Sequence, residues 1–291
     1  MPRLPPELER DIFELAALLN PECMPPLLLV AHRVKIWIEP LLYRVLRICF
    51  DGIPAKPTPG KAHRLGSIRK MLARRDPAFL LANIHHISFT ESPSARPGDS
   101  GILDVLCVCQ GPDSKMEDLC LPPTMYHACP SLVDRLAELP NIRRFSGSII
   151  QLIVCAGQPD SFPSHPFFER LTHMNLADRS DPRTTVAERL FTHLPDLPNL
   201  THLAFHDNRV GNHACVQVLR ECRTLRVFAI VCSSKNGVQI ARGRHKELEL
   251  DVRFAVLFVA DTRWDWEVGA RGGLDMWTRA EDIVARKRLK H

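Results

Sequence analysis

The chain contains 291 residues, of which 45% are hydrophobic and 24% charged, a balance that is ordinary for a folded globular protein. Its net charge of +5 is too small to favour nucleic-acid binding. No apolar run approaches the roughly 18 residues that span a membrane, and charged residues interrupt the N-terminus where a secretion signal would be apolar. The ten cysteines are therefore expected to be reduced and mostly buried, in a protein of the cytoplasm, the nucleus or both.

Residues 2–50 predict a helical region. Pro5-Pro6 opens a first helix, because proline is tolerated in the first turn. Its apolar positions recur at helical spacing and are Leu8, Ile12, Leu15 and Leu19. A second helix is expected over 25–39, ending at Pro40, and 41–50 then alternates like a half-buried strand. The apolar stripe of the first helix can pack on the second helix.

An apolar motif of the form L-x-x-L-x-L recurs along residues 51–260. The clearest copies are 168–178 and 197–207. The central apolar residues of seven copies are spaced about 28 residues apart and are Ile87, Leu119, Phe145, Met174, Leu203, Phe228 and Leu257. A period of roughly 20–29 residues is typical of leucine-rich repeats. The sequence therefore predicts an α/β fold, a short irregular solenoid with parallel strands on its concave side and helices on its convex side.

Amphipathic segments between these strands predict the convex helices. They are 61–75, 102–109, 131–139, 185–194 and 213–221. The segment 148–168 is interrupted by glycines and prolines, which predicts an irregular loop.

The C-terminal segment, 261–291, is predicted to cap the solenoid. Phe254–Val259 is apolar at every position, as in strands that are buried on both faces. Trp264, Trp266 and a final helix over about 275–289 are the candidates for covering it, because terminal repeats need caps.

The N-terminal sequence also resembles a known family. It combines Leu4-Pro5-x-Glu7-Leu8-x-x-x-Ile12-Phe13-x-Leu15 with Leu-Leu-Val-Ala-His-Arg at 28–33 and with Trp37. Together with the phrases at 37–46 and 269–277, this resembles the F-box-like proteins with leucine-rich repeats that are abundant in mushroom-forming fungi. An F-box usually carries Cys-Arg after its valine and a tryptophan soon after, whereas this chain has Ala31-His32 and a later tryptophan.

The resemblance implies that residues 1–50 are an F-box-like helical region that docks on a Skp-type adaptor of a cullin-RING ubiquitin ligase. It also implies that the repeats hold a target protein. The residues expected to contact the adaptor are Leu4, Pro5, Leu8, Ile12 and Phe13.

No catalytic or cofactor-binding motif is present, so the sequence predicts no enzyme and no cofactor. Two groups of residues could suggest a metal site: Cys107, Cys109, Cys120 and Cys129, and His202, His206 and His213. The cysteines lack the C-x2-C spacing of a zinc module, and no cysteine or acid shares the spacing of the histidines. We interpret the cysteines as core residues and predict no metal site.

The residues on either side of each central apolar residue are expected to line the concave face. His202 would then be exposed, while its neighbour Leu203 would be buried. The candidate partner-binding face consists of His86, Asp118, Arg144, His173, Asn175, His202 and His206. Such a polar face of mixed charge fits either a merely solvated sheet or a protein-binding groove.

Two functions remain open from the sequence. One is a substrate-recruiting subunit of a ubiquitin ligase, which binds a Skp-type adaptor and an unknown protein target, but neither nucleic acid nor membrane. The other is an interaction scaffold without a link to ubiquitin ligases, whose N-terminal helices only cap the solenoid. Apolar residues left exposed on 4–30 favour the first function, since a cap would bury them against the first strand.

Overall fold

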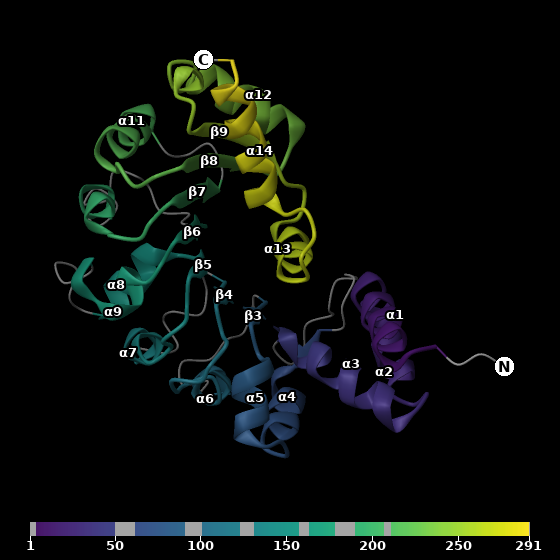
Figure 1. The fold of residues 1–291 in the computed structure, drawn as a ribbon. Coiled ribbons are helices and arrows are strands. Elements are labelled where there is room, and N and C mark those ends of the chain that lie inside the picture. Colours follow the sequence, from purple (N-terminus) through teal and green to yellow (C-terminus); the bar gives the residue numbers. More distant parts are fainter. Residues whose placement is uncertain are drawn as a thin grey trace.

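Helices and parallel strands alternate along most of the chain in the computed structural model, which is a mixed α/β fold (Figure 1). The structure describes residues 4–49, 62–90, 101–122, 131–156, 163–177, 190–206 and 211–290. The strands follow the inner side of an arc, and most helices lie on its outer side. This arrangement is solenoid-like, as the period of the sequence predicts.

A nine-stranded parallel sheet forms the inner layer. Its strands are β1 (Val45–Cys49), β2 (His63–Arg64), β3 (His86–Phe89), β4 (Asp118–Cys120), β5 (Arg144–Gly147), β6 (His173–Leu176), β7 (His202–His206), β8 (Val227–Cys232) and β9 (Phe254–Phe258). Their order is β2-β1-β3-β4-β5-β6-β7-β8-β9, so from β3 onward each strand pairs with the next one along the chain. Each connection therefore adds one strand and its outer helices to the arc.

The strand register confirms most of the predicted strand centres. Met174 of β6 lies opposite Leu203 of β7, and Leu203 lies opposite Phe228 of β8. The same row continues through Phe145, Leu119, Ile87 and Leu46. Every side chain in this row is at most 1% exposed and belongs to one continuous core beneath the outer helices. Burying such a side chain stabilises the fold by about 1.5–3 kcal/mol.

The predicted centre of the last repeat is wrong. Phe254, and not Leu257, lies opposite Phe228. The segment Phe254–Val259 is apolar at every position, so alternation gives no information on which residues face the outer helices. The prediction that this strand is buried on both faces is confirmed, apart from Phe258, which is 39% exposed.

The outer layer consists of short helices that bury their apolar side on the sheet. They are α4 (Leu65–Leu72), α5 (Pro77–Asn83), α6 (Gly101–Cys107), α7 (Leu132–Ala137), α8 (Ile149–Ala156), α9 (Pro166–Glu169), α11 (Asn212–Glu221) and α12 (Lys235–Arg244). Short 3-10 turns lie at Leu194–Asp196 and Leu248–Leu250.

Some of these outer helices differ from the predicted ones. The predicted loop over 148–168 instead contains α8 and α9, because the apolar run that starts at Ile149 buries itself in the core. Helices α5 and α12 were not anticipated. The first half of the predicted helix over 185–194 lies outside the described residues, and its second half is helical at 190–193. The cysteine at position 129 and the loop over 51–60 also lie outside the described residues.

Three helices precede the sheet: α1 (Pro6–Leu19), α2 (Met24–Leu27) and α3 (His32–Arg44), with a 3-10 turn at Pro21–Cys23. The predicted break at Pro40 is wrong, since α3 continues through this residue to Arg44. Proline removes one helical hydrogen bond, but α3 buries Val34, Ile38 and Tyr43, and this packing offsets the loss.

Two helices lie on the inner side of the arc: α13 (Thr262–Ala270) and α14 (Met276–Arg288). Figure 1 shows α14 alongside β8 and β9, and α13 farther into the space that the arc encloses. The predicted final helix is therefore confirmed. Asp275 is its N-cap and accepts a hydrogen bond from the Thr278 backbone N–H at 2.9 Å.

Candidate functional site

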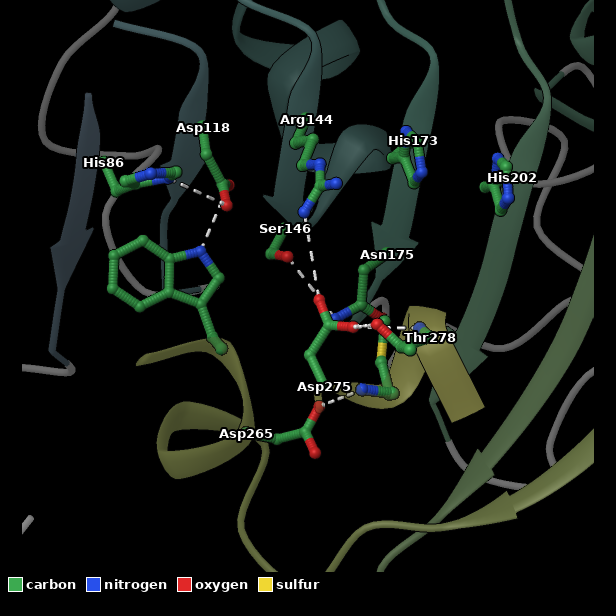
Figure 2. A network of polar contacts seen from close by, with 12 residues as sticks. His86, Asp118, Arg144, Ser146, His173, Asn175, His202, Asp265, Asp275 and Thr278 are labelled. Carbon is green, nitrogen blue, oxygen red and sulfur yellow. Dashed lines mark hydrogen bonds and ion pairs between the residues drawn. The ribbon is translucent and has the colours of Figure 1, made fainter. Parts of the chain in front are cut away.

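The sheet register assembles the predicted concave row. His86 lies opposite Asp118, Asp118 opposite Arg144, Arg144 opposite His173, and His173 opposite His202. Figure 2 shows these side chains projecting from neighbouring strands towards the same side of the sheet. The prediction that they share a face is confirmed, because residues matched in register on parallel strands point the same way.

This face is covered by the chain's own C-terminal segment. His86 and Asp118 are each only 5% exposed, and His202 is 6% exposed. The prediction that His202 lies on a solvated face is therefore wrong, although its neighbour Leu203 is fully buried as expected. The error has a physical reason, since the repeat period shows which side a residue faces but not that a distant helix returns to cover it.

Helix α13 contacts the sheet through Trp266. The indole Nε1 donates a hydrogen bond to Asp118 Oδ1 at 3.1 Å, and the ring meets His86 edge to face with centroids 6.4 Å apart. Trp266 was expected to cover the last strand, but it lies over β3 and β4 instead. Trp264 is 44% exposed and does not supply that cover either.

A buried ion pair joins α13 to β1, the first strand of the chain. Arg47 Nη1 lies 3.0 Å from Glu267 Oε2, and the two side chains are 5% and 0% exposed. Arg271 also contacts Glu267, with its Nη2 3.0 Å from Oε1. Burial lowers the pKa of Arg47, while the charge of Glu267 opposes that shift. Sequence analysis missed this contact, although a charged residue inside an apolar strand was an available signal.

The two matched histidines of β6 and β7 stack on each other. The rings of His173 and His202 are 4.0 Å apart at 7°, and Trp277 of α14 contacts both edge to face, with centroids 5.2 and 5.7 Å away. Burial lowers the pKa of His173 to about 2, with His202 and Arg144 as further causes. Burial also lowers the pKa of His202, although nearby Glu281 opposes that shift. Both rings are therefore neutral at pH 7.

Charged contacts place α14 against this row of side chains. His202 Nε2 lies 3.0 Å from Glu281 Oε1. Arg144 Nη1 lies 3.8 Å from Asp275 Oδ2, a distance at which charges attract without a hydrogen bond. Figure 2 shows Asp275 beneath Arg144 and Ser146. The polar row thus fixes where the N-terminus of α14 sits on the sheet.

A small cavity lies where α13, α14 and the sheet meet. Its volume is ≈ 20 Å³, and its polar lining includes Arg144, Ser146, Asn175 and Asp275. The side chain of Asn175 is mostly buried, and its Oδ1 accepts no hydrogen bond within the described part of the chain. A cavity of this size holds about one or two water molecules and is too small for a nucleotide or a similar cofactor.

The remaining candidate ligands do not gather into a metal centre in the described ranges. No group there of three or more His, Cys, Asp or Glu side chains could hold a metal ion. Burial raises the pKa of Cys109, Cys215 and Cys222 to about 12, so these thiols stay protonated at neutral pH and are poor nucleophiles. His206 ends β7 and is partly exposed.

The predicted adaptor-binding residues lie on α1 and just before it. Leu4, Leu8 and Ile12 are 51–57% exposed, and Pro5 is also exposed. Phe13 differs, because it is only partly exposed and packs on the small core between α1 and α3. The first four residues are therefore exposed, whereas Phe13 faces the small core.

The apolar stripe of α1 faces solvent rather than the next helix. Leu15 and Leu19 are 57% and 70% exposed. The expectation that this stripe packs on the second helix is wrong. Helix α1 instead turns Phe13 and Ala17 towards α3, and Arg33 Nη2 of α3 lies 2.6 Å from Glu9 Oε1. The smaller alanine face allows close packing of the two helices and leaves the leucines outside.

Two comparisons with known proteins identify no family and no relative of this chain. No protein-family model matches the chain, and a search of curated proteins finds no match. Within the ranges that the structure describes, no helix has both the length and the apolar character needed to cross a bilayer.

Proposed function

We propose that this chain is a non-enzymatic protein-interaction module that recruits a target protein to a Skp-type adaptor of a cullin-RING ubiquitin ligase. The observation that carries the proposal is the exposed apolar surface of the first helix. We define the α1 face as Leu4, Pro5, Leu8, Ile12, Leu15 and Leu19. Its leucines and isoleucine are each more than half exposed. Contiguous apolar surface that stays in water usually marks a protein interface.

The sequence resemblance supports the choice of partner. The Leu-Pro-x-Glu-Leu phrase of an F-box falls on residues 4–8, which begin the α1 face. The exposed acids Glu7 and Asp11 lie beside it and give the apolar surface a negative rim. On this proposal, the N-terminal helices are an F-box-like region, the solenoid is built of irregular leucine-rich repeats, and the protein works in the cytoplasm or the nucleus.

The competing hypothesis treats the N-terminal helices only as a solenoid cap. Helix α3 fits that role, because it buries Tyr43 in the core of the solenoid and leads directly into β1. Helix α1 does not fit, since a cap would bury its apolar face and this face is exposed. The N-terminal helices also share a separate small core, built around Ala17 and Met24. This organisation supports a docking unit attached to the solenoid.

Capture of a purified Skp-type adaptor tests the proposal. Wild-type protein should bind the adaptor at micromolar concentration, and Ile12→Glu should weaken binding at least tenfold while the protein stays folded. Ile240→Glu is the matched control, because Ile240 is also an exposed isoleucine, 45% accessible, but lies on α12 at the other end of the chain.

Failure of the wild-type protein to capture any Skp-type adaptor would overturn the ligase proposal and leave the scaffold hypothesis. Equal loss of binding in both isoleucine variants would instead show that the α1 face is not the contact surface.

A further inference from the structure

The C-terminal segment contacts the inner side of the sheet in two different ways. Over β7–β9, α14 closes an apolar cluster. The cluster contains Ala204, Val227, Ala229, Val231, Ala255, Leu257, Val259, Met276, Trp277, Ala280 and Val284. Over β1, β3 and β4, α13 reaches the sheet through polar atoms of Trp266 and Glu267. Helix α14 is therefore anchored by apolar burial, and α13 by a few directed contacts.

The sheet surface beneath α13 does not need a cover in order to stay in water. Its side chains are mostly polar or small and include Arg47, His86, Ser88, Asp118, Cys120, Arg144 and Ser146, with Val45 as a larger apolar residue beside His86. The buried Arg47–Glu267 pair adds little net stability, because removing two charges from water offsets most of their attraction. Such a pair fixes position more than it stabilises. The contact of α13 with the sheet is thus specific, and a ligand that carries the same chemical groups can replace it with little loss of free energy.

The connection between α13 and α14 turns at a glycine. Between α13 and α14, Gly272 has a φ of +84°, a left-handed conformation that glycine adopts without strain. Leu274 in the same connection is 72% exposed. Polar contacts of Asp265 tie the two helices together, since Asp265 accepts a hydrogen bond from the Met276 backbone N–H at 2.7 Å and pairs with Arg279. A competitor for the sheet is therefore needed to release α13.

We infer that α13 is an internal ligand in the target-binding groove, and that the target is an acidic segment carrying a tryptophan. This inference rests on the proposed function, in which the repeats hold a target. The segment Asp265-Trp266-Glu267 supplies the template, since a carboxylate meets Arg47 and an indole N–H meets Asp118. Asp275, which faces Arg144, belongs to the N-terminus of α14 and stays in place. A target segment with the same groups would replace α13 contact for contact.

The charged residues of the target-binding groove, which is the sheet surface beneath α13, determine which target it can bind. Two arginines, Arg47 on β1 and Arg144 on β5, lie on strands at either side of Asp118, and Arg47 is the one that pairs with a carboxylate of α13. Asp118 between them requires a donor, which an indole N–H provides without a positive charge. A purely basic segment would face both arginines and is excluded by like-charge repulsion.

Competition by a synthetic peptide of residues 260–275 tests the inference on the full-length protein. The fluorescent peptide should bind wild-type protein weakly, because α13 holds the groove. The double variant Trp266→Ala/Glu267→Gln should bind it at least tenfold more tightly. Adding Arg47→Met to that variant should cancel the gain, and a peptide carrying the same two substitutions should not bind. Asp282→Asn, at an exposed acid of α14, is the control and should behave as wild type.

Equal peptide binding by wild-type protein and the double variant, or binding that ignores Arg47, would overturn the inference. Adaptor capture by the same proteins separates the two proposals, because the α1 face is unchanged in them. If adaptor capture persists while the peptide fails to bind, only the groove inference is lost.

Amide hydrogen exchange of the wild-type protein provides a test that needs no variant to fold. The amides of α13 should exchange at least tenfold faster than the core amides of α14, since α13 opens separately. Equal protection of the two helices would contradict an internal ligand that can be displaced.

Discussion

The two halves of the inner sheet face differ although both are built of parallel strands paired in register. One row of side chains runs from His86, Asp118 and Arg144 at one end to Val227 at the other, and the next row runs from Ser88 and Ser146 to Ala204 and Ala229. The first half meets α13 through hydrogen bonds and ion pairs, and the second half meets α14 through apolar packing.

The difference teaches that a change of side chains along the sheet decides which part of the C-terminal segment is permanent. Exposing apolar surface to water costs about 25 cal/mol for each Å². Separation of α14 from its half of the face is therefore strongly unfavourable. Polar surface regains hydrogen bonds to water, so the half under α13 tolerates exposure. Four predictions test this contrast, in order of decreasing effect.

The same charge introduced into the two halves should have very different effects. Ala229→Asp places a carboxylate in the apolar cluster under α14, where Ala229 is 1% exposed, and should destabilise the protein by more than about 4 kcal/mol. Ser146→Asp, at the matching position of β5, should cost about 1 kcal/mol, because Arg144 and solvent are nearby. Urea denaturation of both variants measures the difference. Similar losses of unfolding free energy would show that both halves exclude water to the same extent.

The two tryptophans of the C-terminal segment offer a matched pair of truncations. Trp277→Ala should cost about 3–5 kcal/mol of unfolding free energy, because Trp277 is 8% exposed and packs on both stacked histidines. Trp266→Ala removes one hydrogen bond and a partly exposed ring, and should cost about 1–2 kcal/mol. The contrast fails if Trp266→Ala is as damaging as Trp277→Ala.

The ion pair between β1 and α13 should show the behaviour of a buried charge. Arg47→Met alone leaves Glu267 buried with only Arg271 beside it, and should cost about 3 kcal/mol. The double variant Arg47→Met/Glu267→Met should be closer to wild type than this single variant, since no unpaired carboxylate remains. Denaturant unfolding of the four proteins of the cycle measures the coupling. Simple additivity of the two substitutions would contradict it.

Acid should weaken the boundary between the two halves, where the histidines stack. The pKa of His173 is lowered to about 2 from an ordinary 6.5, chiefly by burial. Below pH 6.5 the unfolded chain takes up a proton that the folded ring does not, so stability is complete above that pH and falls as the pH falls. His173 alone should contribute a loss of about 1.4 kcal/mol per pH unit between pH 6 and pH 4.

The variant His173→Asn is the control for this pH effect. Its unfolding free energy should depend on pH less steeply than that of wild-type protein, by about one proton. A wild-type stability that stays flat between pH 7 and pH 5 would show that the ring is solvated.

Much of the core followed from the order of residues alone. The alternation around Met174 and Leu203 predicted strands, the inward face and their pairing, because a period of two places every second side chain on one side. The same logic failed at Leu257, where no polar residue marks the outer face. It also failed for the helix over 149–156, because nearby glycines and prolines outweighed a short apolar run.

The sequence by itself determined the period, the shared face of the polar row and the amphipathic character of the first helix, because each depends on neighbours along the chain. Only the tertiary structure decided what covers those surfaces. Arg47 and Glu267 are 220 residues apart, and no local pattern encodes their contact. The stripe of Leu8 and Ile12 likewise shows that one side of a helix is apolar, but packing of Phe13 and Ala17 on α3 decided that this stripe faces water.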